Sequence, residues 1–266
     1  MTRLEWDQPG ERLYETGLDR GVLYLPNGRG IPWNGLVSVH EKFEDVGSEP
    51  LHIDGLKYFD DQTVGDFAAT IQAFTYPDEF LEFEGTSEVN DVGLFATYQN
   101  RPTFGLSYRT LIGNDTQGTE YSYKIHVLYN LTAVPTTKDY TTLTNSPTLS
   151  TFAWDISSVP EPAPGFRPTG HIIFDMTDLS PLVRGAVEGL LWGDQFGEST
   201  LPSIVEFQQL IGESTKLTIT DNGDGSWTAD GPLELVRMIG ATEFQIDEVD
   251  AIYTDADTYQ VTTTQL

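Results

Sequence analysis

The chain has 266 residues, of which 38% are hydrophobic, so it is long enough for one large domain or for a domain with a smaller appendage. It has no cysteine, which excludes disulfides, thiolate metal sites and a cysteine nucleophile. The 41 Asp and Glu residues outnumber 14 Lys and Arg and give a formal net charge of −27, which argues against a nucleic-acid binder because such proteins cluster Lys and Arg against phosphates.

The sequence shows neither a membrane-spanning segment nor a signal peptide. No window approaches the roughly 20 apolar residues that span a membrane. Residues 1–17 lack the apolar run of a signal peptide. The acidity itself has two interpretations: it keeps an abundant protein soluble, or it faces a negatively charged partner that must not bind.

In the first part of the chain, short β-like runs alternate with turn residues. A polar N-terminal arm precedes a strand over 21–25, which Pro26, Asn27 and Gly28 close with a turn. Further strands are expected over 36–41 and 69–76, and Asp54-Gly55 predicts a hairpin within 51–59. Residues 92–98 fit either a strand or a turn of helix.

The stretch 102–131 is the predicted centre of the fold. Its segments 103–112 and 120–131 are rich in aromatic and β-branched residues, and the turn-forming segment 113–119 separates them. The residues alternate between two faces in each strand, with Phe104, Leu106 and Tyr108 on one face of the first. Arg109, a rare cation in this acidic chain, lies beside them.

The second part of the chain adds two helices and further strands. Residues 132–150 are expected to be a long loop or exposed arm, and 152–156 and 171–175 to be strands. A helix is expected over 180–193, with Ser180 as N-cap and Pro181 at its first position. A shorter helix over 203–211 is expected to end at Gly212.

After residue 216 the pattern returns to strands. Asn222-Gly223 and Asp224-Gly225 predict a hairpin, and 243–263 predicts two or three strands. The expected fold is therefore mainly β, a sandwich or barrel with one or two packed helices. The expected division is a β domain over 1–212, with an N-terminal arm and helices near 181–193 and 203–211, and a C-terminal β extension over 213–266.

No catalytic, cofactor-binding or metal-binding residues are predicted. The calcium-like stretch 221–225 has glycines where oxygen ligands belong, which favours a plain turn. The chain lacks a Gly-x-Ser-x-Gly elbow and a phosphate-binding glycine loop, and its acidic pairs are typical of solvated loops. The four histidines are far apart in sequence and are interpreted as isolated structural residues: His40, His52, His126 and His171.

Several segments resemble the major tail proteins of long-tailed, siphovirus-type bacteriophages. They occur in the same order and together extend over roughly residues 11–211, whereas 216–266 matches less clearly. The segments are residues 14–24, 32–36, 54–58, 70–80, 104–115, 118–130 and 165–169.

The resemblance implies a non-enzymatic structural virion protein, the major tail tube subunit. Such subunits form stacked hexameric rings around a tape measure protein, with tail terminator and distal tail proteins as further partners. Double-stranded DNA passes through the channel without specific binding, and no membrane or cofactor is involved. The protein would be made in the host bacterial cytoplasm and reside in the virion tail.

Under this interpretation the acidity gains a mechanism, because an acidic lumen repels DNA phosphates and keeps the duplex moving. The candidate lumen-facing acids are Asp54, Asp60, Asp61, Asp78, Glu79, Glu82 and Glu84. The alternatives are a minor tail, distal tail or baseplate protein, a carbohydrate- or receptor-binding β module, and a glycosidase. The five tryptophans are too scattered in sequence to indicate a carbohydrate platform.

Overall fold

The computed structural model divides the chain into two compact units: residues 1–178 with 189–201, and residues 179–188 with 202–266. The boundary expected at residue 212 stays a prediction. The structure describes residues 5–42, 45–46, 51–54, 56–59, 63–64, 66–90, 93–136, 138, 142, 150–195, 197–214, 216–221, 227–230, 236–238, 244–246, 249–255 and 258–263.

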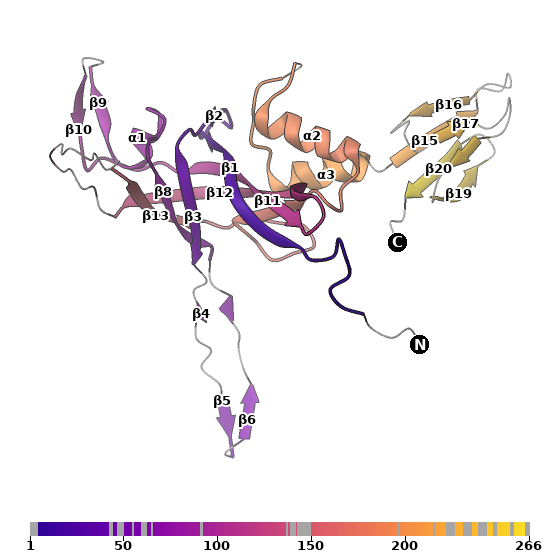
Figure 1. The fold of residues 1–266 in the computed structure, drawn as a ribbon, viewed down its shortest axis with the longest axis horizontal. Coiled ribbons are helices and arrows are strands. Elements are labelled where there is room, and N and C mark those ends of the chain that lie inside the picture. Colours follow the sequence, from indigo (N-terminus) through magenta and orange to yellow (C-terminus); the bar gives the residue numbers. More distant parts are fainter. Residues whose placement is uncertain are drawn as a thin grey trace. The chain divides into compact units, whose positions relative to one another are not determined.

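The first unit is built on one antiparallel sheet that holds eight strands of the described chain (Figure 1). Its order is β2-β1-β11-β12-β13-β8-β3, and β14 also pairs with β12. The strands are β1 (Tyr14–Tyr24), β2 (Gly30–Pro32), β3 (Leu36–Lys42), β8 (Ala68–Ala73), β11 (Phe104–Asn114), β12 (Gly118–Pro135), β13 (Phe152–Ser158) and β14 (His171–Asp175). The mainly β class predicted from the sequence is confirmed.

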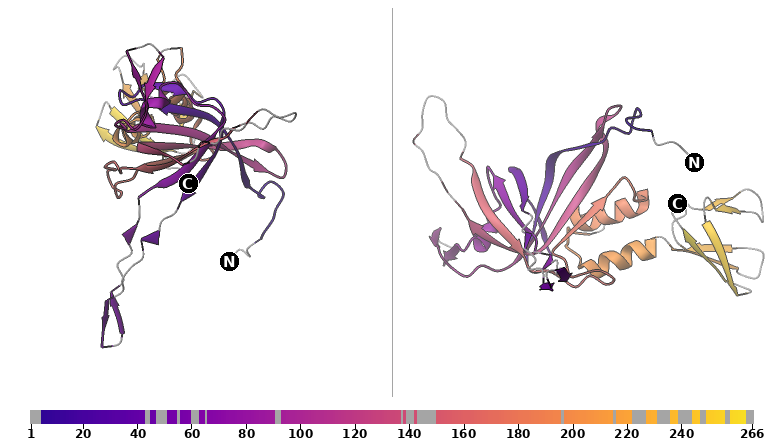
Figure 2. Two further views of the ribbon diagram at one scale, coloured as in Figure 1. Left: turned by 90° about the vertical axis from the view of Figure 1, so that its left-hand side faces the viewer. Right: turned by 90° about the horizontal axis from the view of Figure 1, so that it is seen from below.

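The predicted central hairpin is the pair β11 and β12, which run side by side in Figure 2. The side-chain oxygen of Asn114 accepts hydrogen bonds from the backbone N–H groups of Thr116 and Gln117, which closes the turn. The last residues of β12, through Pro135, pair with β13, so the loop expected from residue 132 begins later. Most of 137–149 lies outside the described residues.

The strand β12 is long enough to pair with two strands on the side opposite β11. Its 18 residues exceed the length of either β13 or β14. Its early residues, Lys124 to Leu128, pair with β14, and its late residues, Leu131 to Pro135, pair with β13. One strand therefore joins β11 to two different neighbours.

Aromatic side chains dominate the core on the inner face of the sheet. Trp33 contacts Phe80 and Trp154 with ring centroids 4.5 and 5.9 Å apart.

The edge strand β3 lies beyond β8 in the sheet order, yet its Glu41 accepts a hydrogen bond from Tyr108 of β11 at 3.0 Å. The sheet therefore curls until its far edge approaches the central hairpin, which encloses the aromatic core.

The described strands between residues 36 and 73 form a nested hairpin of three antiparallel pairs. The strands β3 and β8 pair at its base, β4 (Asp45–Val46) pairs with β7 (Thr63–Val64), and β5 (Leu51–Ile53) pairs with β6 (Leu56–Phe59) (Figure 1). Asp54 has a φ of 53°, the left-handed conformation that a tight turn requires. The hairpin predicted within 51–59 is confirmed as the end of this longer element.

Small elements lie between β8 and β11. The short helix α1 (Phe80–Phe83) buries both of its terminal phenylalanines. The strands β9 (Ser87–Val89) and β10 (Leu94–Ala96) form a two-stranded pair, so the undecided segment 92–98 contains a strand.

The helix α2 (Pro181–Trp192) confirms the prediction for 180–193. The hydroxyl of Ser180 accepts a hydrogen bond from the N–H of Val183 at 3.4 Å, and Gly193 follows the helix with a φ of 80°. The last turn packs against the outer face of the sheet, because the buried Tyr24 hydroxyl donates to the backbone oxygen of Leu191 at 2.8 Å.

The second unit contains α3 (Ile204–Ser214), which begins with a reciprocal cap between Ser203 and Glu206. The helix was expected to end at Gly212, and that was wrong: Gly212 lies inside the helix, without the positive φ of a terminating glycine. No helix in the described residues is both long enough and apolar enough to span a membrane.

The remaining strands of the second unit confirm the β pattern predicted after residue 216. The four-stranded sheet has the order β16-β15-β20-β19, and β17 pairs with β18. The strands are β15 (Lys216–Asp221), β16 (Trp227–Asp230), β17 (Val236–Met238), β18 (Phe244–Ile246), β19 (Val249–Asp255) and β20 (Thr258–Thr263). The predicted turn residues 222–225 lie outside the described residues.

Candidate functional site: a histidine–carboxylate cluster and the exposed surfaces

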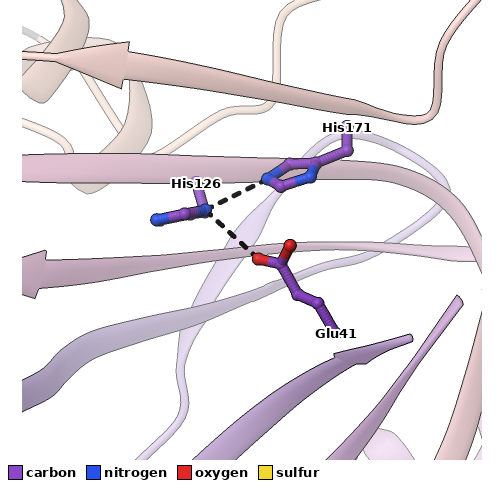
Figure 3. A group of neighbouring side chains, drawn as sticks. All are labelled: Glu41, His126 and His171. Atoms are coloured by element: carbon purple, nitrogen blue, oxygen red, sulfur yellow. Dashed lines mark hydrogen bonds and ion pairs between the residues drawn. The ribbon is translucent and has the colours of Figure 1, made fainter. Parts of the chain in front are cut away.

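A polar cluster lies among the strands of the first unit, where Glu41 of β3, His126 of β12 and His171 of β14 converge (Figure 3). The Nδ1 of His126 is 3.1 Å from the Nε2 of His171 and 3.6 Å from the Oε1 of Glu41. The His126 side chain is 8% exposed and the Glu41 side chain 26%, so the cluster is largely shielded while one carboxylate remains accessible to water.

Neighbouring strands hold the His126 ring in place. The ring stacks on Tyr108 with an interplanar angle of 7°, and the hydroxyl of Tyr108 donates to Glu41. On its other side, the His126 Nε2 is 3.2 Å from the hydroxyl of Thr110, which itself donates to Glu15 at 2.7 Å. The imidazole is therefore contacted through both nitrogens and one face.

The electrostatics keep both histidines neutral at pH 7. Burial is the main cause that lowers the pKa of His126, and the neighbouring His171 adds to it, against opposition from Glu41 and Glu15. Burial also lowers the pKa of His171, to about 4. Burial together with the Glu41 charge raises the pKa of Tyr108, so the phenol stays protonated and can donate.

A charge pair anchors the outer end of the cluster. Partial burial would raise the pKa of Glu15, but the hydrogen bonds from Lys124 and Thr110 more than offset it and the pKa lies below its usual value. Correspondingly, the hydrogen bond to Glu15 raises the pKa of Lys124. The Lys124–Glu15 distance is 2.9 Å.

The expectation that all four histidines are isolated was wrong for two of them. His126 and His171 are 45 residues apart in sequence, and the pairing of β12 with β14 brings them to the same face of the sheet. No spacing motif announces such a pair, because strand order decides it. His40 lies outside the cluster, 3.1 Å from the hydroxyl of Ser38, and the side chain of His52 is outside the description.

The candidate lumen acids fall into three groups: exposed, outside the described residues, and buried. Asp54, Asp78, Glu79 and Glu82 are exposed, whereas Asp60 and Asp61 lie outside the described residues. Glu84 must be removed from the set, because it is only 6% exposed and bonds to Lys138 at 2.7 Å and to the indole of Trp154 at 3.0 Å. Its carboxylate accepts hydrogen bonds inside the first unit and does not lie on a solvent-facing wall.

Three of the exposed acids share a groove. Asp78, Glu79 and Glu82 line a depression of about 540 Å³ together with Glu88 and apolar side chains that include Leu81. Arg29 approaches Glu79 at 3.8 Å. The groove is therefore a region of concentrated negative charge on the first unit.

Arg109, singled out in the sequence, has a structural partner. Its guanidinium donates to both carboxylate oxygens of Asp19, at 2.7 and 2.5 Å, and lies 5.0 Å from the ring centroid of Tyr123. The pair joins β1 to β11 on the half-buried part of the sheet.

Exposed apolar side chains gather at the end of the nested hairpin. In β5 and β6, Ile53 is 47% exposed, and Leu56 and Tyr58 are each 74% exposed. In the described chain these strands pair only with each other. Trp6, near the N-terminus, is 73% exposed. We call Ile53, Leu56 and Tyr58 the hairpin tip surface. Trp6 is a separate exposed apolar residue in the N-terminal arm.

No family model and no curated protein matches this chain. Solved structures share weak similarity with it, and three of them illustrate its kind. One is a chain of an extracellular contractile injection system, the PVC sheath–tube complex in the extended state, with 12% identity, 65% of this chain and 95% of that chain covered, and a TM-score of 0.32.

The second is a chain of the anti-feeding prophage baseplate, with 10% identity, 66% of this chain and all (100%) of that chain covered, and a TM-score of 0.30. The third, from the PVC sheath/tube terminator in the extended state, has 12% identity, coverage of 65% and 99%, and a TM-score of 0.28. The similarity is thus to components of tail-like injection assemblies, and at these TM-scores it carries no argument about function.

Proposed function

We propose that the protein is the major tail tube subunit of a phage tail or tail-like particle. The observation that carries the proposal is the hairpin tip surface, three exposed apolar side chains at the end of a two-stranded element. The ordered sequence segments that resemble major tail proteins, within roughly residues 11–211, provide separate support.

The hairpin tip surface needs a partner for physical reasons. A two-stranded hairpin is only marginally stable alone in water, and exposed apolar side chains on it favour association. A second copy of the chain is the occupant we propose, because a hairpin that reaches a neighbouring subunit can be repeated around a ring. The sheet also ends at β2 and β3 in the described chain, which offers strand edges for the same association.

The remaining parts of the proposal follow the tail-tube resemblance. Subunits form hexameric rings that stack into a tube around a tape measure protein, between a tail terminator and a distal tail protein. DNA crosses the tube without specific binding, and the protein is a non-enzymatic component of the virion. The net charge of −27 supports passage, because carboxylates on a channel wall repel phosphates.

Electron microscopy of the purified full chain tests the proposal. We expect stacked six-fold rings or tubes, which form at higher protein concentration and disappear on dilution. Single rings that never stack would favour a minor tail, distal tail or baseplate protein. A chain that stays monomeric at every concentration would contradict assembly by this protein alone.

A further inference from the structure

We propose that Glu41, His126 and His171 bind one divalent transition-metal ion of the zinc class. The proposal is independent of the tail-tube function, because it rests only on side chains within the first unit. Two imidazole nitrogens and one carboxylate oxygen suit zinc, cobalt or nickel, whereas calcium and magnesium prefer all-oxygen sites.

The ligand atoms are already spaced as a metal requires. The distances between the His126 Nδ1 and the other two atoms are 3.1 and 3.6 Å, and all three atoms lie within 4.8 Å of one another. Bonds of about 2.0–2.2 Å in a tetrahedral arrangement would place ligand atoms roughly 3.3–3.5 Å apart. Small rotations of the side chains are sufficient to close the remaining difference.

The donors and acceptors around His126 favour a bound cation between the three side chains. The hydroxyl of Thr110 donates its one proton to Glu15, so the His126 Nε2 must donate to the oxygen of Thr110. The His126 Nδ1 then carries a lone pair, and His171 donates to it. Under that arrangement the Glu41 carboxylate faces a nitrogen lone pair at 3.6 Å, which is repulsive, whereas a bound cation makes the same approach attractive.

The surroundings also resemble those that orient metal ligands. The His126 Nε2–H points to Thr110 and Glu15, and Tyr108 donates to Glu41, so two of the three ligands have an outer partner. Glu41 is 26% exposed, which leaves a route for the ion and for a water as fourth ligand. On binding, His171 exchanges its Nε2 proton for one on Nδ1, so the ring remains neutral.

The ion would have a structural consequence. His126 and His171 come from paired strands, but Glu41 comes from β3 at the far edge of the sheet. A bound ion therefore fastens the curled edge of the sheet to its centre and should stabilise the folded chain in proportion to the logarithm of the free-metal concentration.

The test uses the full chain without a histidine tag, treated with EDTA and dialysed. Calorimetric titration with zinc and visible spectroscopy with cobalt measure binding, and magnesium is the control ion. We expect one zinc per chain and a cobalt absorption band typical of nitrogen and oxygen ligands. Glu41→Gln and His171→Gln should each weaken zinc binding at least tenfold, and Tyr108→Phe about 10-fold or more.

Two variants distinguish a loss of metal binding from a loss of the fold. In Glu41→Gln the amide oxygen can still accept from Tyr108, so loss of binding would reflect the lost charge and not a lost fold. His40→Gln, on the same strand but outside the cluster, should leave the affinity unchanged. Absent zinc binding in the folded parent, or binding that is insensitive to Glu41→Gln and His171→Gln, would overturn the proposal.

Discussion

The indole nitrogen of Trp154 donates a hydrogen bond of 3.0 Å to the Oε2 of Glu84, and the Oε1 of the same carboxylate accepts from Lys138 at 2.7 Å. Trp154 is fully buried and Glu84 is 6% exposed. A carboxylate thus satisfies the one polar atom of a large aromatic side chain inside the core, and the pair joins β13 to the residue that follows α1.

The first prediction concerns this buried carboxylate. Glu84→Ala leaves the buried Trp154 N–H without its acceptor and removes an ion pair from Lys138, so it should lower the free energy of unfolding by about 2–4 kcal/mol. Urea denaturation followed by tryptophan fluorescence measures the change. Glu82→Ala, two residues away and exposed, should change it by less than about 0.5 kcal/mol. Equal stability of the two variants would contradict the role assigned to Glu84.

Local sequence chemistry accounts for much of the fold. The hairpin of β11 and β12 was predictable because alternating aromatic and β-branched residues flank a Gly-Asn-Asp turn. The helix α2 was predictable because Ser180 and Pro181 precede a regular apolar spacing, and Gly193 follows it. Both signals lie within about 30 neighbouring residues.

The histidine cluster and the burial of Glu84 were not predictable from the sequence, because both depend on contacts between strands far apart in the chain. The His126–His171 contact requires β14 to pair with the first half of β12, and the Glu41 contact requires the sheet to curl. Glu84 was predicted to face the lumen, and nothing in the local sequence distinguishes it from the exposed acids around it. Its burial depends on Trp154, which is 70 residues away in the chain.

The second prediction concerns the buried face of α2. Val187 is fully buried whereas Leu190 is only half-buried, so Val187→Asp should destabilise the chain by about 3–5 kcal/mol and Leu190→Asp by less. Gly185 is exposed, and a methyl group there would meet no atom within 4 Å. Gly185→Ala should therefore raise stability by about 0.5–1 kcal/mol through helix propensity. Thermal melts of the three variants give the order, and an unaffected Val187→Asp variant would contradict the placement of the helix.

The third prediction is a pH dependence of stability. Because the pKa of His171 falls from 6.5 unfolded to about 4 folded, the unfolded state binds more protons between these values. Stability from this group is therefore complete above pH 6.5 and decreases as the pH falls towards 4, by up to about 3 kcal/mol. The lowered pKa of His126 acts in the same direction.

Urea unfolding in EDTA at pH 7.5, 6 and 5 measures this effect by difference. The many carboxylates also titrate near the acid end of the range, so the comparison is between the parent and His171→Gln. The variant should lose stability more slowly as the pH falls, whereas His40→Gln should follow the parent. A His171→Gln curve parallel to that of the parent would show that His171 is not held neutral by the fold.

The fourth prediction separates assembly from folding. Leu56→Asp with Tyr58→Asp places charges on the hairpin tip surface, where both side chains are 74% exposed, so the melting temperature should change little. Rings and tubes should be lost or should require a much higher protein concentration, because apolar association is replaced by repulsion. Light scattering and electron microscopy measure this. A control pair, Glu11→Lys with Glu120→Lys, changes the net charge by +4 at exposed positions elsewhere, against −2 for the tip variant, and should preserve assembly. Normal tubes from the Leu56→Asp, Tyr58→Asp chain would show that the tip is not part of the interface.

The last prediction concerns charge and the passage of DNA. We expect the assembled tube to present an excess of carboxylates to its lumen, with the groove acids Asp78, Glu79 and Glu82 as the first candidates, because they are exposed and close together. Replacement of all three by Lys changes the charge of a six-subunit ring enough for the wall to attract phosphates. Each Lys that contacts a phosphate makes DNA retention more dependent on salt.

Tubes assembled from the triple variant should therefore retain short double-stranded DNA at low salt and release it as salt rises, whereas parent tubes should retain none. A triple replacement at Glu11, Glu120 and Glu198 gives the same change of net charge on other exposed positions. If both triple variants retain DNA equally, the groove acids do not line the channel in preference to other exposed acids. A reconstruction of the tube then counts the lumen-facing side chains by sign, and a neutral or basic inner wall would mean that the −27 charge serves solubility alone.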